Sequence, residues 1–364
     1  MDIGILTYYG VPNHGALLQA NALQHVLQSM GHEVRFLTFD RSYEYISTEQ
    51  TKKYKIGLKS IPFFFKYTIN TGLGNVFYNY KKSNTLKAFR KDYFNLDTSY
   101  DEFEGDVVVV GSDEVFSLEI GYNPVMYGYG IKASQIVSYA ASFGPTTIKD
   151  IYEKEKSSAI ALGLQSFSAI SVRDLNSQRV INQLTSKEVP LVCDPVILYG
   201  YEKEIEAYTP NEADYLVIYA YTDRMNDEEE VRAIREYASN HGLKVYSVGY
   251  YHKWCDKSIN VSPVELLGWI RNATLTITDT FHGSVMSIIC NTPLIVKLRD
   301  NANKLEYLMS EYGLLERIIN DFQSIEKVSS GKIDFEDVNR RIKDRRKESM
   351  EYIKTAIERE NAKD

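Results

Sequence analysis

Polar and charged residues follow several β-type runs of the sequence, at the points where strands would end. Asp279, Thr280 and His282 follow "LTIT", Arg173 follows "ISV", and Asp113 follows "VVVVG". In an open parallel sheet, ligands bind beyond the carboxyl ends of the strands, so these side chains are expected to face one site. Carboxylates, an imidazole and a guanidinium together suit proton transfer and the binding of an anionic substrate.

His282 is expected at the start of a helix in "TDTFHGSVMSIICNTPLIV", directly after a strand. A packed helix-start residue is the default interpretation. At this position, however, unpaired backbone N–H groups and the helix dipole favour an anion, and histidine titrates near neutrality. Gly283 and Ser284 would leave room for a ligand. We therefore predict that His282 supplies or removes protons, with Asp113 or Asp279 orienting it or activating a hydroxyl.

Arg173 is expected in the first turn of a helix, where the dipole does not favour a cation. An anionic partner is therefore expected, either Asp174 or a ligand carboxylate or phosphate. For Asp113, the alternative to a role in the site is a purely structural role as a helix cap. For His14, the alternative is an exposed position at the start of a helix. The sequence alone leaves these alternatives open.

The elements that would position these residues form two series of alternating strands and helices. "IGILTYY", "EVRFLTF", "DVVVVG" and "QIVSYAASFG" predict strands of a first half, and "YLVIYAY", "LKVYSVGY" and "LTITDT" predict strands of a second. Short joins between strands and helices indicate parallel sheets. We predict an α/β, GT-B-like fold with two doubly wound Rossmann-like domains facing across a cleft. The predicted parts are residues 1–205, with a basic aromatic helical insert at 50–95, residues 206–330, and a C-terminal helix at 331–364.

Composition excludes several classes of protein. The net charge of -7 argues against a general nucleic-acid binder. No apolar run reaches the roughly 18 residues of a membrane span, and no basic segment precedes the first apolar run, so we expect a cytoplasmic protein. Cys193, Cys255 and Cys290 show no pairing or ligand spacing, so no metal site is expected. The glycine fingerprints of dinucleotide enzymes and P-loop kinases are absent.

Residues 50–91 reverse the charge of the chain locally. They contain ten Lys or Arg and no Asp or Glu, with aromatic residues between them. Surface helices whose aromatic residues pack on the sheet are one interpretation. A patch that contacts an anionic membrane surface is the other, since aromatic side chains favour headgroup depth and lysines favour anionic lipid.

Six segments in order resemble the polysaccharide pyruvyl transferase family. They are "NHGALLQANALQHVL", "DVVVVGSDEVF", "SYAASFG", "ISVRDLNS", "VCDPVILY" and "TDTFHGSVMSIICNTPLIV", and "RDNANKLEYLMSEYGLLERII" resembles the closing segment. The resemblance implies transfer of pyruvate from phosphoenolpyruvate onto a sugar as a cyclic ketal, in a bacterial cell-surface glycan such as a capsule or exopolysaccharide. His282 matches the family's histidine before glycine, and Arg173 its arginine in "SVR". Thr280 stands where some members have arginine, so Lys297, Arg299 or Lys304 would replace that cation.

With this resemblance, the strand-end residues divide into two groups. Donor-binding residues are predicted to be Arg173, Thr280, Gly283, Ser284, Lys297 and Arg299. Acceptor-binding residues are predicted to be Asn13, His14, Ser112 and Glu114. Phosphoenolpyruvate would be a co-substrate with no separate cofactor, and the acceptor sugar would be free or linked to a polyprenyl diphosphate lipid at the inner face of the membrane.

Two other functions fit parts of the sequence. A glycosyltransferase of the same fold would bind a nucleotide sugar, and Glu311 or Glu316 in "SEYGLLE" would hold the ribose. A glycan-binding or scaffold protein would need no reactive residues, and the polar residues at every strand end argue against it.

Overall fold

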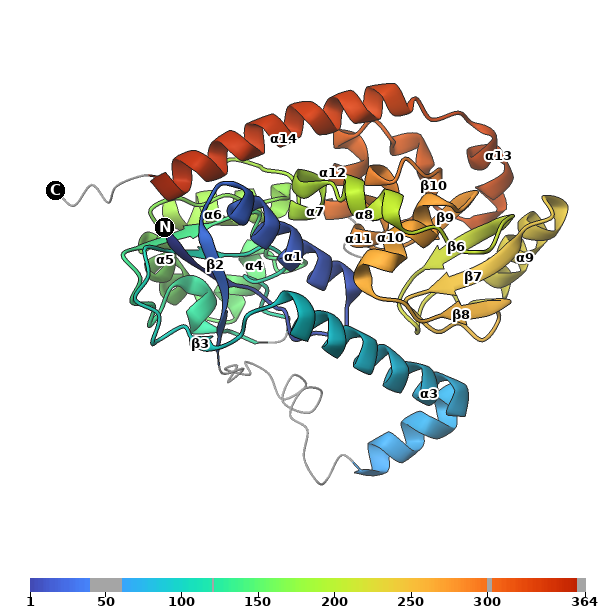
Figure 1. The fold of residues 1–364 in the computed structure, drawn as a ribbon, viewed down its shortest axis with the longest axis horizontal. Coiled ribbons are helices and arrows are strands. Elements are labelled where there is room, and N and C mark those ends of the chain that lie inside the picture. The colour runs from blue at the N-terminus through green and yellow to red at the C-terminus, as the bar shows by residue number, and fades with distance from the viewer. Residues whose placement is uncertain (40–60, 120, 300–302, 359–364) are drawn as a thin grey trace.

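The computed structural model describes residues 1–39, 61–119, 121–299 and 303–358, and within them the chain forms two parallel β-sheets with helices packed around them (Figure 1). This arrangement confirms the predicted α/β class. The first sheet has the strand order β3-β2-β1-β4-β5 and consists of β1 (Asp2–Leu6), β2 (Glu33–Thr38), β3 (Thr98–Ser99), β4 (Val107–Val110) and β5 (Gln135–Ser138). The second has the order β11-β10-β9-β6-β7-β8 and consists of β6 (Tyr215–Tyr219), β7 (Lys244–Val248), β8 (Lys257–Ile259), β9 (Leu275–Thr278), β10 (Leu294–Lys297) and β11 (Ile318–Ile319).

Every strand pair in both sheets is parallel, so each connection must return to the start of the next strand. Most of these connections contain helices, whereas β7 and β8 are joined by residues 249–256 without one. The helices of the first half are α1 (His14–Ser29), α3 (Ile61–Tyr93), α4 (Ile148–Glu153), α5 (Ser157–Gln165), α6 (Leu175–Thr185), α7 (Pro195–Tyr199) and α8 (Glu202–Ala207). Those that follow are α9 (Glu228–Asn240), α10 (Pro263–Arg271), α11 (Phe281–Ile289), α12 (Asn303–Glu311), α13 (Ile325–Ser330) and α14 (Phe335–Glu358). Short 3₁₀ helices lie at Pro124–Tyr127, Leu315–Arg317 and Phe322–Ser324.

Local sequence signals explain where the main helices begin. Asn13 caps α1, because its side-chain oxygen accepts from the backbone N–H of Gly15 at 2.9 Å. Ser262 caps α10, and Pro263 occupies its first turn, as the sequence predicts. Strand β4 is buried along its whole length, which agrees with its uninterrupted run of valines. The run "ISV" does not form a named strand, since only isolated bridges occur here, at Val172 and at the preceding Ala169.

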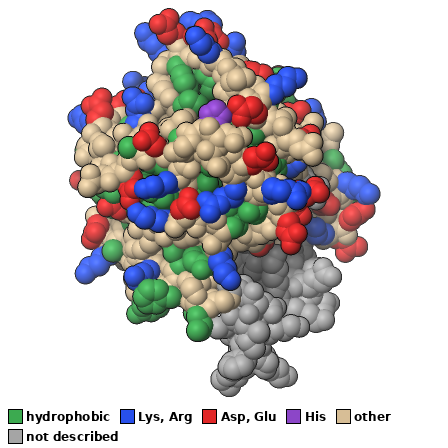
Figure 2. Space-filling view, turned by 90° about the vertical axis from the view of Figure 1, so that its right-hand side faces the viewer, with side chains coloured by type: hydrophobic (Ala, Val, Ile, Leu, Met, Phe, Trp, Pro, Cys, Tyr) green, Lys and Arg blue, Asp and Glu red, His purple; other side chains and the backbone are tan. Residues whose placement is uncertain are grey.

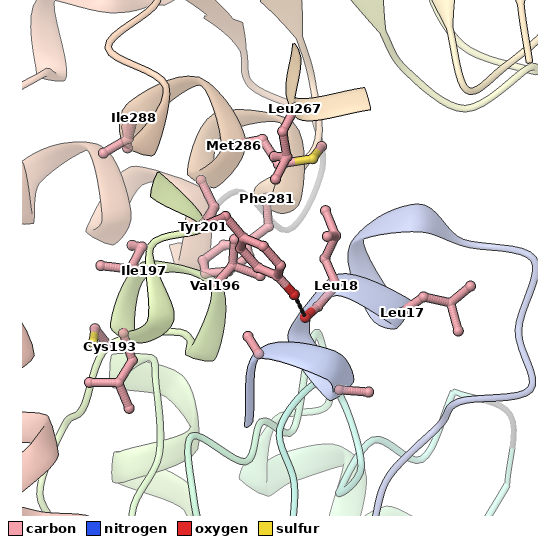
Figure 3. Packing of buried hydrophobic residues seen from close by; sticks show 14 of the residues in the cluster. Leu17, Leu18, Cys193, Val196, Ile197, Tyr201, Leu267, Phe281, Met286 and Ile288 are labelled. Atoms are coloured by element: carbon pink, nitrogen blue, oxygen red, sulfur yellow. Dashed lines mark hydrogen bonds between the residues drawn. The ribbon is translucent and has the colours of Figure 1, made fainter. Parts of the chain in front are cut away.

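A continuous hydrophobic core joins the two halves (Figure 3). Tyr201 lies at its centre, and its hydroxyl donates to the carbonyl oxygen of Leu18 at 2.8 Å. Side chains from both halves surround it, namely Leu17 and Leu18 of α1, Val196 and Ile197 of α7, Leu267 of α10, and Phe281, Met286 and Ile288 of α11. Because this core holds α7 against α1 and α11, the loops before α7 and α11 are brought close together.

Helix α14 runs across the top of both halves and returns to the first (Figure 1). Ser349 Oγ accepts from the backbone N–H of Cys193 at 2.9 Å, and Gln135 Nε2 donates to the carbonyl oxygen of Ala356 at 2.6 Å. The apolar side of this helix is buried and consists of Val338, Ile342, Ile353 and Ile357. Residues 359–364 of the predicted C-terminal helix lie outside the described residues.

The predicted boundary between residues 205 and 206 falls inside α8, which contacts α10 of the second half. The predicted insert at 50–95 contains α3, while its residues 50–60 lie outside the described residues. None of the helices in the described part of the chain is long and apolar enough to cross a membrane.

Candidate active site

A buried arginine with a carboxylate at each end of its guanidinium group lies at the centre of the site. Arg173 Nη2 donates to Asp113 Oδ1 at 2.9 Å, and Arg173 Nη1 donates to Asp194 Oδ2 at 2.7 Å. The guanidinium carbon also lies 4.6 Å from the ring centroid of Phe281 in the second half. Asp113 follows β4, Arg173 precedes α6, and Asp194 caps α7 through the backbone N–H of Val196. The fold thus brings together residues that are far apart in the sequence.

His282 joins this group from the opposite half of the molecule. It lies in the first turn of α11, and its Nε2 atom is 3.7 Å from Asp194 Oδ2, which is an ion-pair distance but longer than a hydrogen bond. The side chain is nearly buried, and Nε2 has no hydrogen-bond partner. A shift of less than 1 Å would close this contact, so Asp194 is placed to orient the imidazole ring.

The first turn of α1 fixes the other side of the His282 ring. A Cβ atom at Gly15 would lie 2.3 Å from His282 Cγ and 2.5 Å from its Nδ1, closer than packed atoms approach. Only glycine therefore allows α1 to pack against the imidazole. This contact gives the "NHG" segment a role that its position in the sequence does not reveal.

The carboxylates of the group are held in their ionised form. Burial raises the pKa of Asp113, but Arg173, His282 and Lys304 outweigh it and hold that pKa below its usual value. Burial likewise raises the pKa of Asp194, and His282 and Arg173 more than offset this. Burial alone would lower the pKa of Arg173, but the two carboxylates raise it above its ordinary value. Asp113–Arg173–Asp194 is therefore a charged chain at neutral pH.

The backbone at Asp113 adopts an unusual conformation. Its φ angle is +75°, in the left-handed region that non-glycine residues rarely occupy. The segment after β5 holds it there, since the backbone N–H of Ser142 donates to the carbonyl oxygen of Asp113 at 2.9 Å. Conformations of this kind cost about 1–3 kcal/mol and cluster at functional sites.

Partly exposed residues surround this buried chain. Lys304 donates to Glu114, and its Nζ atom lies 5.9 Å from the ring centroid of Phe281. Asn13 Nδ2 donates to the Tyr221 hydroxyl at 3.4 Å, across the two halves. Burial, together with Asp113 and Glu114, raises the pKa of Tyr221 to about 12. These contacts place Asn13, Glu114, Tyr221 and Lys304 around the charged chain.

Asp279 belongs to a second ionic group. Arg299 donates from Nε to Asp279 Oδ2 at 3.1 Å and makes two bonds to Glu230, at 2.7 and 2.9 Å. Arg224 Nη1 lies 3.8 Å from Asp279 Oδ1. The Asp279 side chain is fully buried, and burial raises its pKa. Asp279 therefore pairs with arginines rather than orienting His282, and Arg299 is already held by two carboxylates.

Two predicted acceptor-binding residues have structural roles instead. His14 is fully buried, and its Nε2 lies 3.0 Å from the carbonyl oxygen of Val261, while burial lowers its pKa to about 3. Ser112 is also fully buried, and its hydroxyl donates to Gln19. Because both side chains are fully buried, neither can contact a sugar in this arrangement. Residues at helix starts and strand ends can pack against neighbouring elements instead of facing a ligand.

Three of the predicted donor-binding residues, Thr280, Gly283 and Ser284, lie in α11 or at its cap. Thr280 caps α11 by accepting from the backbone N–H of Gly283 at 3.0 Å. Gly283 gives no room to a ligand, since a Cβ atom there would lie 2.2 Å from Thr278 Oγ1. Ser284 is fully buried and donates to the Thr280 carbonyl.

Two predicted donor-binding cations are also already engaged. Lys297 donates to the carbonyl oxygen of Asn320 and lies over Phe322. The Arg173 guanidinium is occupied by two carboxylates and buried, which suits a positioning role rather than direct contact with the donor.

The structure adds Asp194, Tyr221 and Arg224, which sequence reasoning did not select. Asp194 is followed by proline, a pattern typical of an ordinary helix cap. Its position directly after the apolar run "PLVC" nevertheless indicates a residue at a strand end. Tyr221 and Arg224 follow β6 at its carboxyl end, in a loop that lacked a predicted role. Among the described residues, no group of three His, Cys, Asp or Glu side chains is placed to hold a metal ion.

Comparison with solved structures defines the class of fold. A putative UDP-N-acetylglucosamine 2-epimerase from Listeria monocytogenes superposes with a TM-score of 0.51 at 10% sequence identity, covering 98% of this chain and 95% of that one. A spinosyn rhamnosyltransferase gives 0.49 at 12% identity, with 98% and 99% covered. The Methanocaldococcus jannaschii UDP-GlcNAc 2-epimerase in complex with UDP-GlcNAc and UDP gives 0.48 at 13%, with 94% and 99% covered. The fold is GT-B-like, as predicted.

The particular family follows from the sequence. The chain belongs to the polysaccharide pyruvyl transferase family, whose sequence model matches residues 13–301. A comparison with curated proteins finds no match. The matched region contains every member of the Asp113–Arg173–Asp194–His282 group, and membership in this family supports a transferase.

Proposed function

We propose that this protein transfers pyruvate from phosphoenolpyruvate to two hydroxyls of one sugar, forming a cyclic ketal and releasing phosphate. The observation that carries this proposal is the Asp113–Arg173–Asp194–His282 chain, assembled from separate segments inside the family match. It provides an ionised carboxylate, an oriented imidazole and a buried cation that holds both acids in place. These are the groups that proton transfer at a hydroxyl and at an enol carbon requires.

The donor is trianionic when its phosphate is fully ionised, so cations that can still reach a ligand are needed. Lys304 and Arg224 keep 27% and 40% of their side-chain surface exposed, whereas Arg173 keeps 1%. We assign the phosphate and carboxylate of phosphoenolpyruvate to Lys304 and Arg224. Lys304 would leave Glu114 when the donor binds, which frees that carboxylate for an acceptor hydroxyl.

The reaction then proceeds in two additions at C2 of the donor. In the first, a sugar hydroxyl bonds to C2, Asp113 removes its proton, and His282 delivers a proton to C3, which becomes a methyl group. In the second, a neighbouring hydroxyl of the same sugar bonds to C2 and gives up its proton to His282. The C2–O bond to phosphate breaks, and the departing phosphate takes the proton that Asp113 holds, so both residues return to their starting states. Because His282 Nε2 faces Asp194, its Nδ1 atom is the one left for the substrate.

The acceptor is assigned to the residues between the two halves. Asn13, Glu114 and Tyr221 offer an amide, a carboxylate and a phenol hydroxyl, which suit sugar hydroxyls. A sugar of a cell-surface glycan or its polyprenyl-linked precursor would fit this role, with the enzyme at the cytoplasmic face of the membrane.

A nucleotide-sugar glycosyltransferase is the second candidate. Its predicted ribose ligand, Glu311, pairs with Arg345 of α14 at 2.6 Å, and burial raises its pKa. Glu316 is exposed and lies 3.7 Å from Arg317 Nε. Of the two residues predicted to hold the ribose, Glu311 is thus already engaged in a structural ion pair.

A thermal unfolding comparison tests the donor assignment. Phosphoenolpyruvate at about 100 times its Kd should stabilise the wild type by about 2.7 kcal/mol, and UDP- or GDP-sugars should not. Lys304→Met should remove the stabilisation, because it deletes a donor cation. Lys297→Met is the matched control, since Lys297 is engaged by Asn320. Stabilisation by a nucleotide sugar alone would favour the glycosyltransferase.

A further inference from the structure

Helix α3 carries a row of large apolar side chains that nothing in the described structure covers. Leu73, Val76, Phe77 and Tyr80 keep 79%, 36%, 60% and 66% of their surface exposed. Their spacing of three and four residues places them on one face of the helix. Exposed apolar side chains are common singly, but a contiguous row of this size marks an interaction surface.

The opposite face of α3 is firmly attached to the molecule. The Tyr78 hydroxyl donates to the carbonyl oxygen of Ile259 at 2.9 Å, and Asn260 Nδ2 donates to Thr85 Oγ1 at 2.7 Å. Leu86 and Phe89 are buried in the core that joins the two halves. The apolar row therefore cannot turn inward without breaking these contacts. Figure 1 shows α3 along the lower edge of the molecule, and Figure 2 shows hydrophobic side chains protruding at the lower edge of an adjacent face.

Positive charge surrounds the apolar row. Lys81, Lys87 and Lys91 are exposed farther along the same helix, and residues 50–91 contain no acid in a chain of net charge -7. Phe77 and Lys81 also line a groove of about 580 Å³ with Lys253 and Lys257 of the second half. The acid in this groove, Asp256, is paired with Arg235 at 2.7 Å, and Lys257 is likewise paired with Glu212, so Lys81 and Lys253 carry the net positive charge of the groove. The surface thus joins apolar and cationic side chains from both halves.

We propose that this face, Leu73–Tyr80 with the surrounding lysines, binds the surface of an anionic lipid bilayer. The apolar row lies at the boundary between headgroups and acyl chains, and the lysines lie at the level of the lipid phosphates. Charge decides against a second copy of this chain, because a symmetric contact through this face would oppose lysine to lysine. The inference concerns a surface remote from the candidate active site and does not depend on the reaction.

Co-sedimentation of the full-length protein with lipid vesicles tests this proposal. Vesicles with about 30% phosphatidylglycerol in phosphatidylcholine should bind the wild type at about 50 mM salt, and pure phosphatidylcholine should bind it far less. Phe77→Ser with Tyr80→Ser should weaken the partition at least about tenfold, and Lys81→Glu with Lys87→Glu should do the same at low salt. Tyr152→Ser with Leu162→Ser is the matched control, since both residues are exposed apolar side chains elsewhere on the surface.

Two results would overturn the proposal. One is wild-type protein that stays in the supernatant with anionic vesicles at low salt. The other is binding that the control pair weakens as much as the Phe77–Tyr80 pair does. Sedimentation without lipid adds an independent check, because self-association that is lost in Phe77→Ser with Tyr80→Ser, without vesicle binding, would assign the face to a second copy instead.

Discussion

At the scale of single residues, the site depends on which side chains are free and which are already paired. Arg173 was predicted to contact the donor, but it is buried between two carboxylates. Breaking such a buried pair leaves an uncompensated charge, which typically costs 3–5 kcal/mol. We therefore propose that Arg173 is a positioning residue and that Lys304 and Arg224, which are partly exposed, bind the anionic donor.

Asp194→Asn tests the contact that orients His282. The amide keeps the size of the side chain and its cap on the Val196 N–H, but it removes the negative charge beside the imidazole and beside the Arg173 guanidinium, so unfolding is measured alongside turnover. We expect kcat to fall on the order of 10²-fold or more, with a smaller change in KM. Asp174→Asn is the control, because Asp174 is a buried helix cap that contacts Ser177 and Ser142. Equal losses of kcat in both variants would contradict an orienting role.

Gly15→Ala tests the packing of α1 against His282. Alanine normally stabilises a helix relative to glycine by about 1 kcal/mol. Here its Cβ would lie 2.3 Å from the imidazole, so the ring or the helix must move. We expect both a lower unfolding temperature and a loss of turnover of about 10²-fold, measured by calorimetry and steady-state kinetics. A more stable variant with normal turnover would show that the contact is unimportant.

At the scale of elements, sequence patterns predicted the helices and strands with strong caps and long apolar runs. Helix α10 is an example, since Ser262, Pro263 and its apolar spacing all agree. Strand β8 (Lys257–Ile259) was not predicted, because three residues with one charge carry too little periodicity. The role of α3 as a bridge between the halves was also hidden, because its contacts with Ile259 and Asn260 are tertiary.

Lys82→Met tests how α3 docks on the second half. Lys82 is buried with its Nζ atom 3.7 Å from the Tyr250 ring centroid, and burial lowers its pKa to about 7. Between pH 7 and about 10.4 the unfolded chain then binds more protons than the folded chain, so wild-type stability rises with pH in this range. His14 nearby stays neutral, with its pKa lowered to about 3, and burial raises the pKa of Tyr78.

The variant has no such titration at position 82. We expect Lys82→Met to be more stable than the wild type at pH 7, with the difference shrinking toward pH 10, as measured by urea unfolding across this range. A difference that stays constant with pH would show that Lys82 remains charged in the folded protein. The Tyr250 ring would then supply the stabilising partner for that charge.

At the scale of the whole molecule, the alternation of strands and helices was sufficient to predict two parallel sheets and a GT-B-like architecture. The same patterns also selected Asp113, Arg173 and His282, which the fold brings together from two halves. Their mutual geometry could not be predicted, because it depends on the core around Tyr201 and on α14 behind Cys193. Asp194 was missed for this reason, since its function exists only once α7 packs against α11.

We propose that His282, oriented by Asp194, transfers protons during pyruvyl transfer. The most direct test is release of inorganic phosphate from phosphoenolpyruvate, with and without lipid-linked or aryl galactosides and mannosides, in the wild type and in His282→Ala. We predict release that depends on the acceptor and falls at least about 100-fold in the variant. Release without any acceptor dependence would contradict pyruvyl transfer, and a loss below about tenfold in His282→Ala would contradict proton transfer by His282.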